Sequence, residues 1–253
     1  MLGSWMSLAW LVLLFVPLLF MQRWINRHLQ GLGLLLLGEG DLHLVLYYLL
    51  LLPGILLHEG SHWLVATLLG VKVSRISIGP ARKGEGQVRF GSVQVARTDP
   101  LRDSLIGLAP LIAGSLAVLL IAHRGFGLPF SPHLSPPQQL RQVVVNLMDY
   151  TTAPDALLWL YLIFAISNAM LPSESDRQPW LPLIVYLGFL AALYYLVAGV
   201  PRMPEGVVSL VRRGLDHLSL AFGLTVLVDL PCIGVLYLLE TVVGSLRGQR
   251  VEY

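Results

Sequence analysis

The segment ILLHEGSHWLVATLLG, residues 55–70, places two histidines and a glutamate inside one of the most apolar stretches of the chain. His58 and His62 are four residues apart, so on a helix their side chains share one face, one turn apart. The pattern H-E-x-x-H on a helix is the signature of zinc hydrolases, in which the histidines bind zinc and the glutamate, here Glu59, is the general base. Because ionisable groups inside a membrane are costly, this cluster favours a functional role over hydrogen bonding between packed helices.

Catalytic zinc needs a third protein ligand and keeps its fourth position for water. The remaining histidines fit poorly, since they lie in predicted loops, near predicted helix ends or well before the motif: His28, His43, His123, His133 and His217. Carboxylates remain as candidates. Asp176 follows an apolar stretch that ends at Pro172, where the backbone can turn back into a protein-lined cavity. Asp229, within the last apolar stretch, is the chief rival, with a helix-packing hydrogen bond as its alternative role, and Glu174 is better explained as solvated.

The composition predicts the environment of this cluster. Hydrophobic residues make up 55 % and charged residues 13 % of the 253-residue chain, and its mean hydropathy is +0.71. Soluble domains carry about 25 % charged residues, so we expect an integral membrane protein. The formal net charge of +2 gives no indication of nucleic acid binding, and a single cysteine, Cys232, excludes a disulfide framework or a thiolate metal site.

A membrane-spanning helix needs about 20 mostly apolar residues. Six stretches meet or nearly meet this length: residues 4–24, 43–70, 103–123, 155–172, 180–200 and 217–245. The run GLGLLLLGEG, residues 31–40, is too short to span and predicts a re-entrant or interfacial piece. We therefore expect an all-α polytopic membrane protein with about six transmembrane helices, forming a single domain over residues 1–253.

Two segments between these stretches have a different character. Residues 71–99 contain short runs rich in β-branched residues around a GPARKGEG turn, which predicts a small membrane-associated β-hairpin. Such a hairpin can hold an extended substrate by strand addition or can serve only as a cap over the site. Residues 124–154 form a proline-rich extramembrane loop in which PPQQLRQVVVNLMDY predicts an amphipathic surface helix. Pro53 and Gly54, just before the motif, are compatible with a loosened helix or with the close approach of a neighbour, although such residues more often only aid packing.

These features resemble the site-2 protease family of intramembrane zinc metalloproteases. That family pairs a membrane-embedded H-E-x-x-H with a later N-x-x-P-x-P-x-x-D-G motif, and the spacing of eight residues between Asn168 and Asp176 matches it. VKVSRISIGP at 71–80 resembles the strand-forming stretch after the first motif, and IGLAPLIAG at 106–114 resembles the start of the family's next helix. The resemblance covers a core of about 43–176.

Beyond that core, residues 1–42 and 177–253 are expected to be accessory helices. The second motif departs from the family pattern at two positions. Pro172 falls four residues after Asn168 instead of three, and Arg177 replaces the glycine.

The resemblance implies a zinc metalloendopeptidase that cleaves peptide bonds in or near the transmembrane segments of membrane proteins. It implies one zinc ion per chain, with Asp176 as the third ligand beside His58 and His62 and with Glu59 as the general base. It also places Asn168 near the zinc, where its amide can support the oxyanion, and a helix-end cap or packing amide is the alternative role. The expected partners are a transmembrane protein substrate and the lipid bilayer.

Two further functions are compatible with the motif: a catalytically inert relative that binds membrane proteins, and a metal transporter. The altered DR pair favours the inert relative, whereas the intact Glu59 argues against it, and the chain has no internal repeat of the kind many transporters show. The densest basic run lies within 72–102, which predicts that the hairpin and the N-terminus face the cytoplasm. The N-terminal stretch has no basic region or clear cleavage site and indicates a retained helix, and the compact chain suggests a bacterial plasma membrane.

Overall fold

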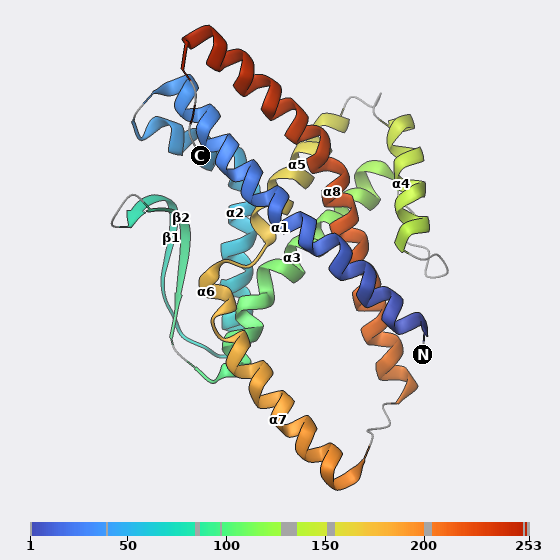
Figure 1. Ribbon diagram of the computed structural model, residues 1–253. Coiled ribbons are helices and arrows are strands. Elements are labelled where there is room, and N and C mark those ends of the chain that lie inside the picture. The colour runs from blue at the N-terminus through green and yellow to red at the C-terminus, as the bar shows by residue number, and fades with distance from the viewer. Residues whose placement is uncertain are drawn as a thin grey trace.

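The computed structural model describes residues 2–38, 40–83, 87–96, 98–127, 136–150, 155–199, 204–249 and 251. The structure is mostly helical, with one two-stranded antiparallel sheet after the second helix (Figure 1). Its elements in chain order are α1 (Leu2–Leu37), α2 (Leu42–Leu68), β1 (Val73–Lys83), β2 (Gln87–Val95), α3 (Pro100–Phe126), α4 (Pro136–Tyr150), α5 (Ala156–Met170), α6 (Glu174–Arg177), α7 (Trp180–Ala198) and α8 (Glu205–Arg247).

Five helical segments of the described chain are long and apolar enough to cross a membrane, as in a multi-pass membrane protein. They comprise α1, α2, α3, the segment Glu174–Val197 and α8. The remaining predicted span, 155–172, forms α5, which has only 15 residues. At 1.5 Å per residue it is about 22 Å long, shorter than the hydrocarbon core of about 30 Å. The predicted six long helices are therefore five, because apolarity without length does not make a span.

Several boundaries differ from the sequence-based prediction. The run at 31–40 is not a separate piece, because α1 continues as one helix of 36 residues to Leu37. The helix α8 begins at Glu205, well before the predicted 217, since a helix continues through polar turns that hydropathy does not mark. The hairpin and the helix at 136–150 are confirmed, but β1 extends through the predicted turn to Lys83. A bulge between Ile78 and Ala81 accommodates this extension.

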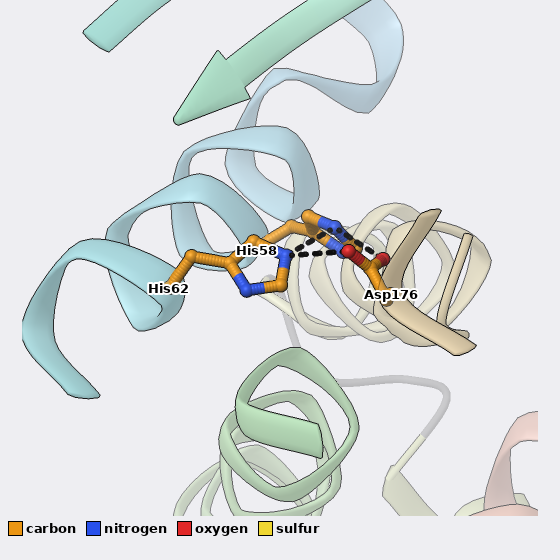
Figure 2. Close-up of side chains that lie close together, drawn as sticks. All are labelled: His58, His62 and Asp176. Carbon is orange, nitrogen blue, oxygen red and sulfur yellow. Dashed lines mark hydrogen bonds and ion pairs between the residues drawn. The ribbon is translucent and has the colours of Figure 1, made fainter. Parts of the chain in front are cut away.

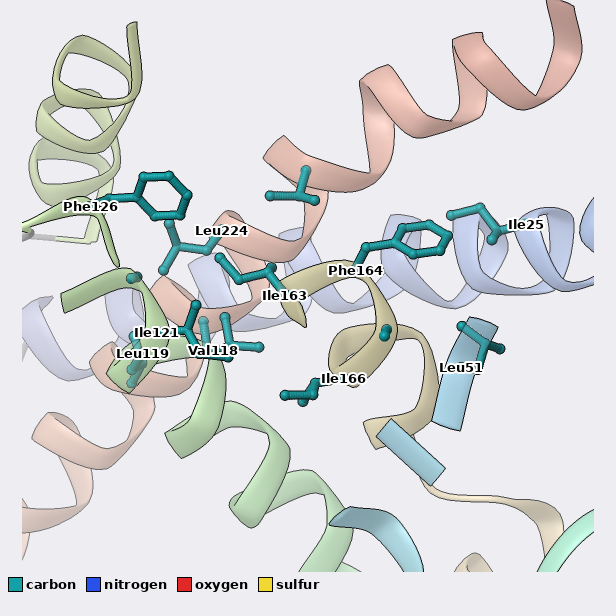
Figure 3. Close-up of a cluster of buried hydrophobic side chains, with 14 of the residues drawn as sticks. Ile25, Leu51, Val118, Leu119, Ile121, Phe126, Ile163, Phe164, Ile166 and Leu224 are labelled. Atoms are coloured by element: carbon teal, nitrogen blue, oxygen red, sulfur yellow. The ribbon is translucent and has the colours of Figure 1, made fainter. Parts of the chain in front are cut away.

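The core lies where α2, α3 and α5 contact one another, with α1 packed along α8. Figure 3 shows buried side chains from α1, α2, α3, α5 and α8 meeting in one cluster. Labelled members of this cluster are Ile25, Leu51, Val118, Ile163 and Leu224. The short helix α5 is therefore enclosed by its neighbours. In contrast, α7 projects away from them (Figure 1), and the apolar 18-residue stretch within Glu174–Val197 has no buried residue.

Glycines bring the helices around α5 into backbone contact. A Cβ atom at Gly54 would lie 2.0 Å from the carbonyl oxygen of Ala165, and one at Gly114 would lie 2.3 Å from the Cβ atom of Met170. Any larger residue would therefore force α2 or α3 away from α5. This confirms the close approach predicted at Gly54, and α2 continues through Pro53 as one helix.

Candidate metal centre

The two histidines of α2 face each other across the predicted site. The Nε2 atoms of His58 and His62 are 3.2 Å apart (Figure 2). Behind them, the Nδ1 atom of His58 lies 2.7 Å from the carbonyl oxygen of Ala169, and that of His62 lies 2.9 Å from the carbonyl oxygen of Ile106. Because a carbonyl only accepts, each Nδ1 carries a hydrogen, and Nε2 is the ring nitrogen that faces the site. This is the arrangement that a metal-ligating histidine takes.

Asp176 reaches the same place from a one-turn helix. The helix α5 ends at Met170 because Leu171, before Pro172, takes an extended conformation with φ −69° and ψ 137°. Ser173 then caps α6: its N–H donates to Oδ2 of Asp176 at 2.7 Å, and its hydroxyl accepts from the N–H of Asp176 at 3.4 Å. The sequence PSESDR thus stops one helix, starts the next and orients the carboxylate.

The three side chains together fit a metal ion. The carboxylate oxygens of Asp176 lie 3.3 Å from Nε2 of His62 and 3.5 Å from Nε2 of His58, and the candidate ligand atoms all lie within 4.8 Å of one another. Bonds of 2.0–2.2 Å to a tetrahedral zinc ion separate neighbouring ligand atoms by about 3.3–3.6 Å. Two imidazole nitrogens and a carboxylate are also a ligand set that zinc accepts. The group His58, His62 and Asp176 can therefore hold a metal ion.

Glu59 lies directly beside the centre, under the hairpin. A Cβ atom at Gly91 of β2 would lie 2.7 Å from Cγ and from Oε1 of the Glu59 side chain. The backbone N–H of Val93 donates to the Glu59 carboxylate. The strand β2 can pass this close only because residue 91 has no side chain.

The start of α3 supports both sources of ligands. The Ile106 carbonyl holds His62, and a Cβ atom at the next residue, Gly107, would lie 2.2 Å from the carbonyl oxygen of Asp176. Asp99 caps this helix by accepting from the N–H of Arg102 at 3.1 Å, and this hydrogen bond lowers the pKa of the exposed Asp99 carboxyl below its usual value. The first two turns of α3 therefore begin at a capped end and then contact both His62 and Asp176.

A cavity of about 530 Å³ opens onto the centre. His62 and Asp176 line this cavity, together with the polar residues Asp103, Ser175 and Gln178. Its other wall comes from β2 and the segment that leads into α3. The cavity therefore offers water a path to the ligands on the hairpin side.

Asn168 is engaged in other contacts, and the two rival carboxylates are not part of the three-ligand group. Both hydrogens of the Asn168 amide are engaged, since Nδ2 donates at 3.0 Å to the Phe164 carbonyl and at 3.0 Å to Oδ1 of Asp229. This contact is the packing role considered for both residues, and Asn168 can donate to an oxyanion only after giving it up. Asp229 does not belong to the three-ligand group found among the described residues, and Glu174 is exposed, as predicted.

The remaining described histidines also lie outside that group. His28 of α1 pairs with Glu240 of α8 and stacks on Trp24, and Nδ1 of His217 faces the carbonyl of Arg213. His133 falls outside the described residues.

Sequence reasoning missed the groups that orient the ligands. The carbonyls of Ala169 and Ile106 carry no residue signature, so only the fold reveals them. Ser173 and Gly107 had a visible signal: a serine three residues before an aspartate is a cap pattern, and small residues mark the stretch at 106–114. Gly91 had none beyond its place in a strand.

No family model, no curated protein and no solved structure matches this chain. The resemblance to the site-2 protease family therefore depends on the quoted motifs alone. What the chain can do has to be argued from the geometry of its own residues.

Proposed function

We propose that this protein is an intramembrane zinc metalloprotease similar to the site-2 protease family, which cleaves peptide bonds in or near transmembrane segments. One observation carries the proposal: the Nε2 atoms of two histidines and a carboxylate lie within 4.8 Å of one another, with Glu59 beside them on an apolar helix. A packing cluster needs neither this glutamate nor Nδ1 hydrogens held by carbonyls. His58, His62 and Asp176 would bind one zinc ion per chain.

The residues divide the chemistry between them. Zinc, when bound, supplies a Lewis acid that acidifies water and polarises a peptide carbonyl. Glu59 takes the proton from the attacking water and returns it to the leaving nitrogen. The Nδ1 hydrogens of His58 and His62 are held by backbone carbonyls, so Nε2 is the nitrogen that each ring would offer to zinc. Asp176 adds the negative charge, and its cap by Ser173 keeps the carboxylate from rotating away.

A helical substrate has to be unwound before cleavage, because its carbonyls are already hydrogen-bonded. The hairpin suits this step. Within the described part of the chain each of its strands is paired on one side only, and β2 runs over Glu59. An extended segment added to the edge of the hairpin would lie beside the general base, with backbone hydrogen bonds as its main attachment. The polar cavity beside His62 supplies the water.

The membrane setting follows from the same reasoning. The five long apolar helices would cross the bilayer, and α5 would add a sixth, shorter helix enclosed among them. The basic residues of 72–102 favour a cytoplasmic N-terminus and hairpin, in the plasma membrane of a bacterium.

Replacing Glu59 by Gln tests the proposal. Purified wild-type chain in detergent is mixed with a pool of synthetic single-span transmembrane peptides, and products are identified by mass spectrometry. We expect Glu59→Gln to retain zinc and to lose cleavage by about 10²–10⁴-fold, the usual contribution of a general base. The exposed Glu174→Gln variant is the matched control and should cleave as the wild type does.

Two results would contradict the proposal. A wild type without zinc would exclude a zinc enzyme. A wild type that holds zinc but leaves every peptide intact would favour the inert membrane protein, as the arginine at 177 does.

A further inference from the structure

Two helices outside the predicted core converge on the last turn of α5. Oδ1 of Asp229, on α8, accepts from Nδ2 of Asn168 at 3.0 Å. Nε2 of Gln22, on α1, donates to the backbone carbonyl of Asn168 at 2.6 Å. Asp229 is 1 % exposed and Asn168 is 3 % exposed, so their contact is removed from solvent. Residue 168 is therefore held from two sides.

The residue that follows orients a predicted metal ligand. The carbonyl of Ala169 accepts from Nδ1 of His58 at 2.7 Å. Ala169 is the next residue of the same helix and its carbonyl belongs to the adjacent peptide unit, so a displacement of Asn168 also shifts this carbonyl through the helix backbone. Loss of the hydrogen-bond partner of a ligating histidine typically weakens metal binding by about 10–100-fold.

The pairing also explains a carboxylate buried among apolar side chains. One hydrogen of the Asn168 amide is satisfied by Phe164 of its own helix, and the other would lack an acceptor without Asp229. In the described structure the Oδ1 atom of Asn168 is buried and has no hydrogen-bond partner. An asparagine at 229 could keep the acceptor and also donate to that oxygen.

The structure assigns Gln22 and Asp229 as positioning residues of the metal centre, which act through Asn168 to hold the Ala169 carbonyl against His58. This assignment rests on the proposed function, since it takes His58, His62 and Asp176 as zinc ligands. It gives α1 and α8 a role in zinc affinity without a ligand of their own.

The test is the zinc affinity of the purified full chain in detergent, measured by competition with a chelator. Asp229→Ala should weaken zinc binding by about 10–100-fold, because the amide of Asn168 loses its acceptor. Asp229→Asn should bind zinc as the wild type does. The matched control is Thr225→Val, one turn earlier on α8: Thr225 is equally buried, but its hydroxyl donates only to Ala221 of the same helix.

A second variant covers the case in which Asp229→Ala does not fold. Gln22→Met removes the other contact from a half-buried position on α1 and should also weaken zinc binding. Cobalt(II) loaded in place of zinc gives a further readout, because its visible absorption bands depend on ligand geometry. We expect altered bands in Gln22→Met and Asp229→Ala but not in Thr225→Val.

The outcomes separate this inference from the proposed function. Wild-type affinity and unchanged cobalt bands in Gln22→Met and Asp229→Ala would overturn the inference and leave the zinc site standing. Equal weakening in Thr225→Val would overturn it too, since loose packing of α8 would then be the cause. A wild type that binds no zinc would overturn both.

Discussion

The two sources of ligands in the metal centre are built in opposite ways. His58 and His62 come from one helix of 27 residues, and His62 is only 7 % exposed. Asp176 comes from a helix of four residues, in which the cap residue Ser173 and the first residue Glu174 are exposed. The histidine pair is therefore positioned by a continuous helix. The aspartate is positioned by the end of α5 at Leu171, by the cap at Ser173 and by a contact with α3.

This difference separates local from tertiary specification. Helix geometry alone places residues four apart on one face, so the rest of the fold has to orient the two histidine rings but not to bring the two residues together. The aspartate needs three conditions together: the break at Leu171, the cap at Ser173 and the space left by Gly107. We therefore expect the position of the histidine pair along α2 to tolerate changes around it, while the orientation of its rings depends on the Ala169 and Ile106 carbonyls, and we expect the position of the aspartate to be sensitive to its surroundings.

Removal of a ligand should give the largest effect. We expect His62→Ala to abolish measurable zinc binding. Asp176→Ala should weaken binding by more than the about 10–100-fold that is lost with outer hydrogen-bond partners. Zinc per chain is measured by elemental analysis after dialysis, with Glu174→Ala, on the same short helix, as the control. Stoichiometric zinc in Asp176→Ala would show that the aspartate is no ligand and would end the comparison.

A change of one methyl group at Gly107 should come next. Its Cβ atom would meet the carbonyl oxygen of Asp176 at 2.2 Å, a backbone atom that can yield only if α6 moves. We expect Gly107→Ala to weaken zinc binding at least tenfold, as for the loss of an orienting contact.

The control for this variant is Gly60→Ala, between Glu59 and Ser61 on α2. A Cβ atom there meets nothing within 4 Å. Zinc binding should be unchanged and the helix slightly more stable, by about 0.4–1 kcal/mol. If both alanine variants bind zinc equally, the aspartate is less dependent on its surroundings than the comparison states.

The same contrast decides what the sequence could predict. His58, Glu59 and His62 were predictable because one spacing on one helix defines them. Asp176 needed the resemblance to a family motif, and from the residues alone Asp229 remained its rival. The full length of α1 could not be predicted, because whether a helix continues beyond an apolar stretch depends on tertiary packing. The two orienting carbonyls could not be predicted either, because every residue has a backbone carbonyl and only the packing decides which ones reach a histidine.

A smaller effect is expected at Ser173. Ser173→Ala removes the hydroxyl that accepts from the N–H of Asp176 but keeps the backbone N–H that donates to its carboxylate. Loss of a serine cap costs about 0.5–2 kcal/mol, so the aspartate should be less well ordered and zinc binding a few-fold weaker. Ser173→Asp keeps an acceptor at the cap and should restore the affinity. A loss as large as in Gly107→Ala would mean that the cap outweighs the contact with α3.

The smallest effect is expected at Asp99, which caps the helix whose second turn contacts both sources of ligands. Asp99→Ala frees the N–H of Arg102 at the start of α3, so this amide should exchange with deuterium faster, while zinc binding changes little. Asp99→Ser, with another capping oxygen, should restore the protection.

Since the folded pKa of Asp99 is lowered, its stabilisation is present above the unfolded pKa and is lost as the pH falls through the folded value. Acid should therefore reproduce the exchange of Asp99→Ala in the wild type. The second turn of α3 has its own contacts, through the Ile106 carbonyl to His62 and through Gly107 to Asp176, so a frayed first turn should leave the ligands in place.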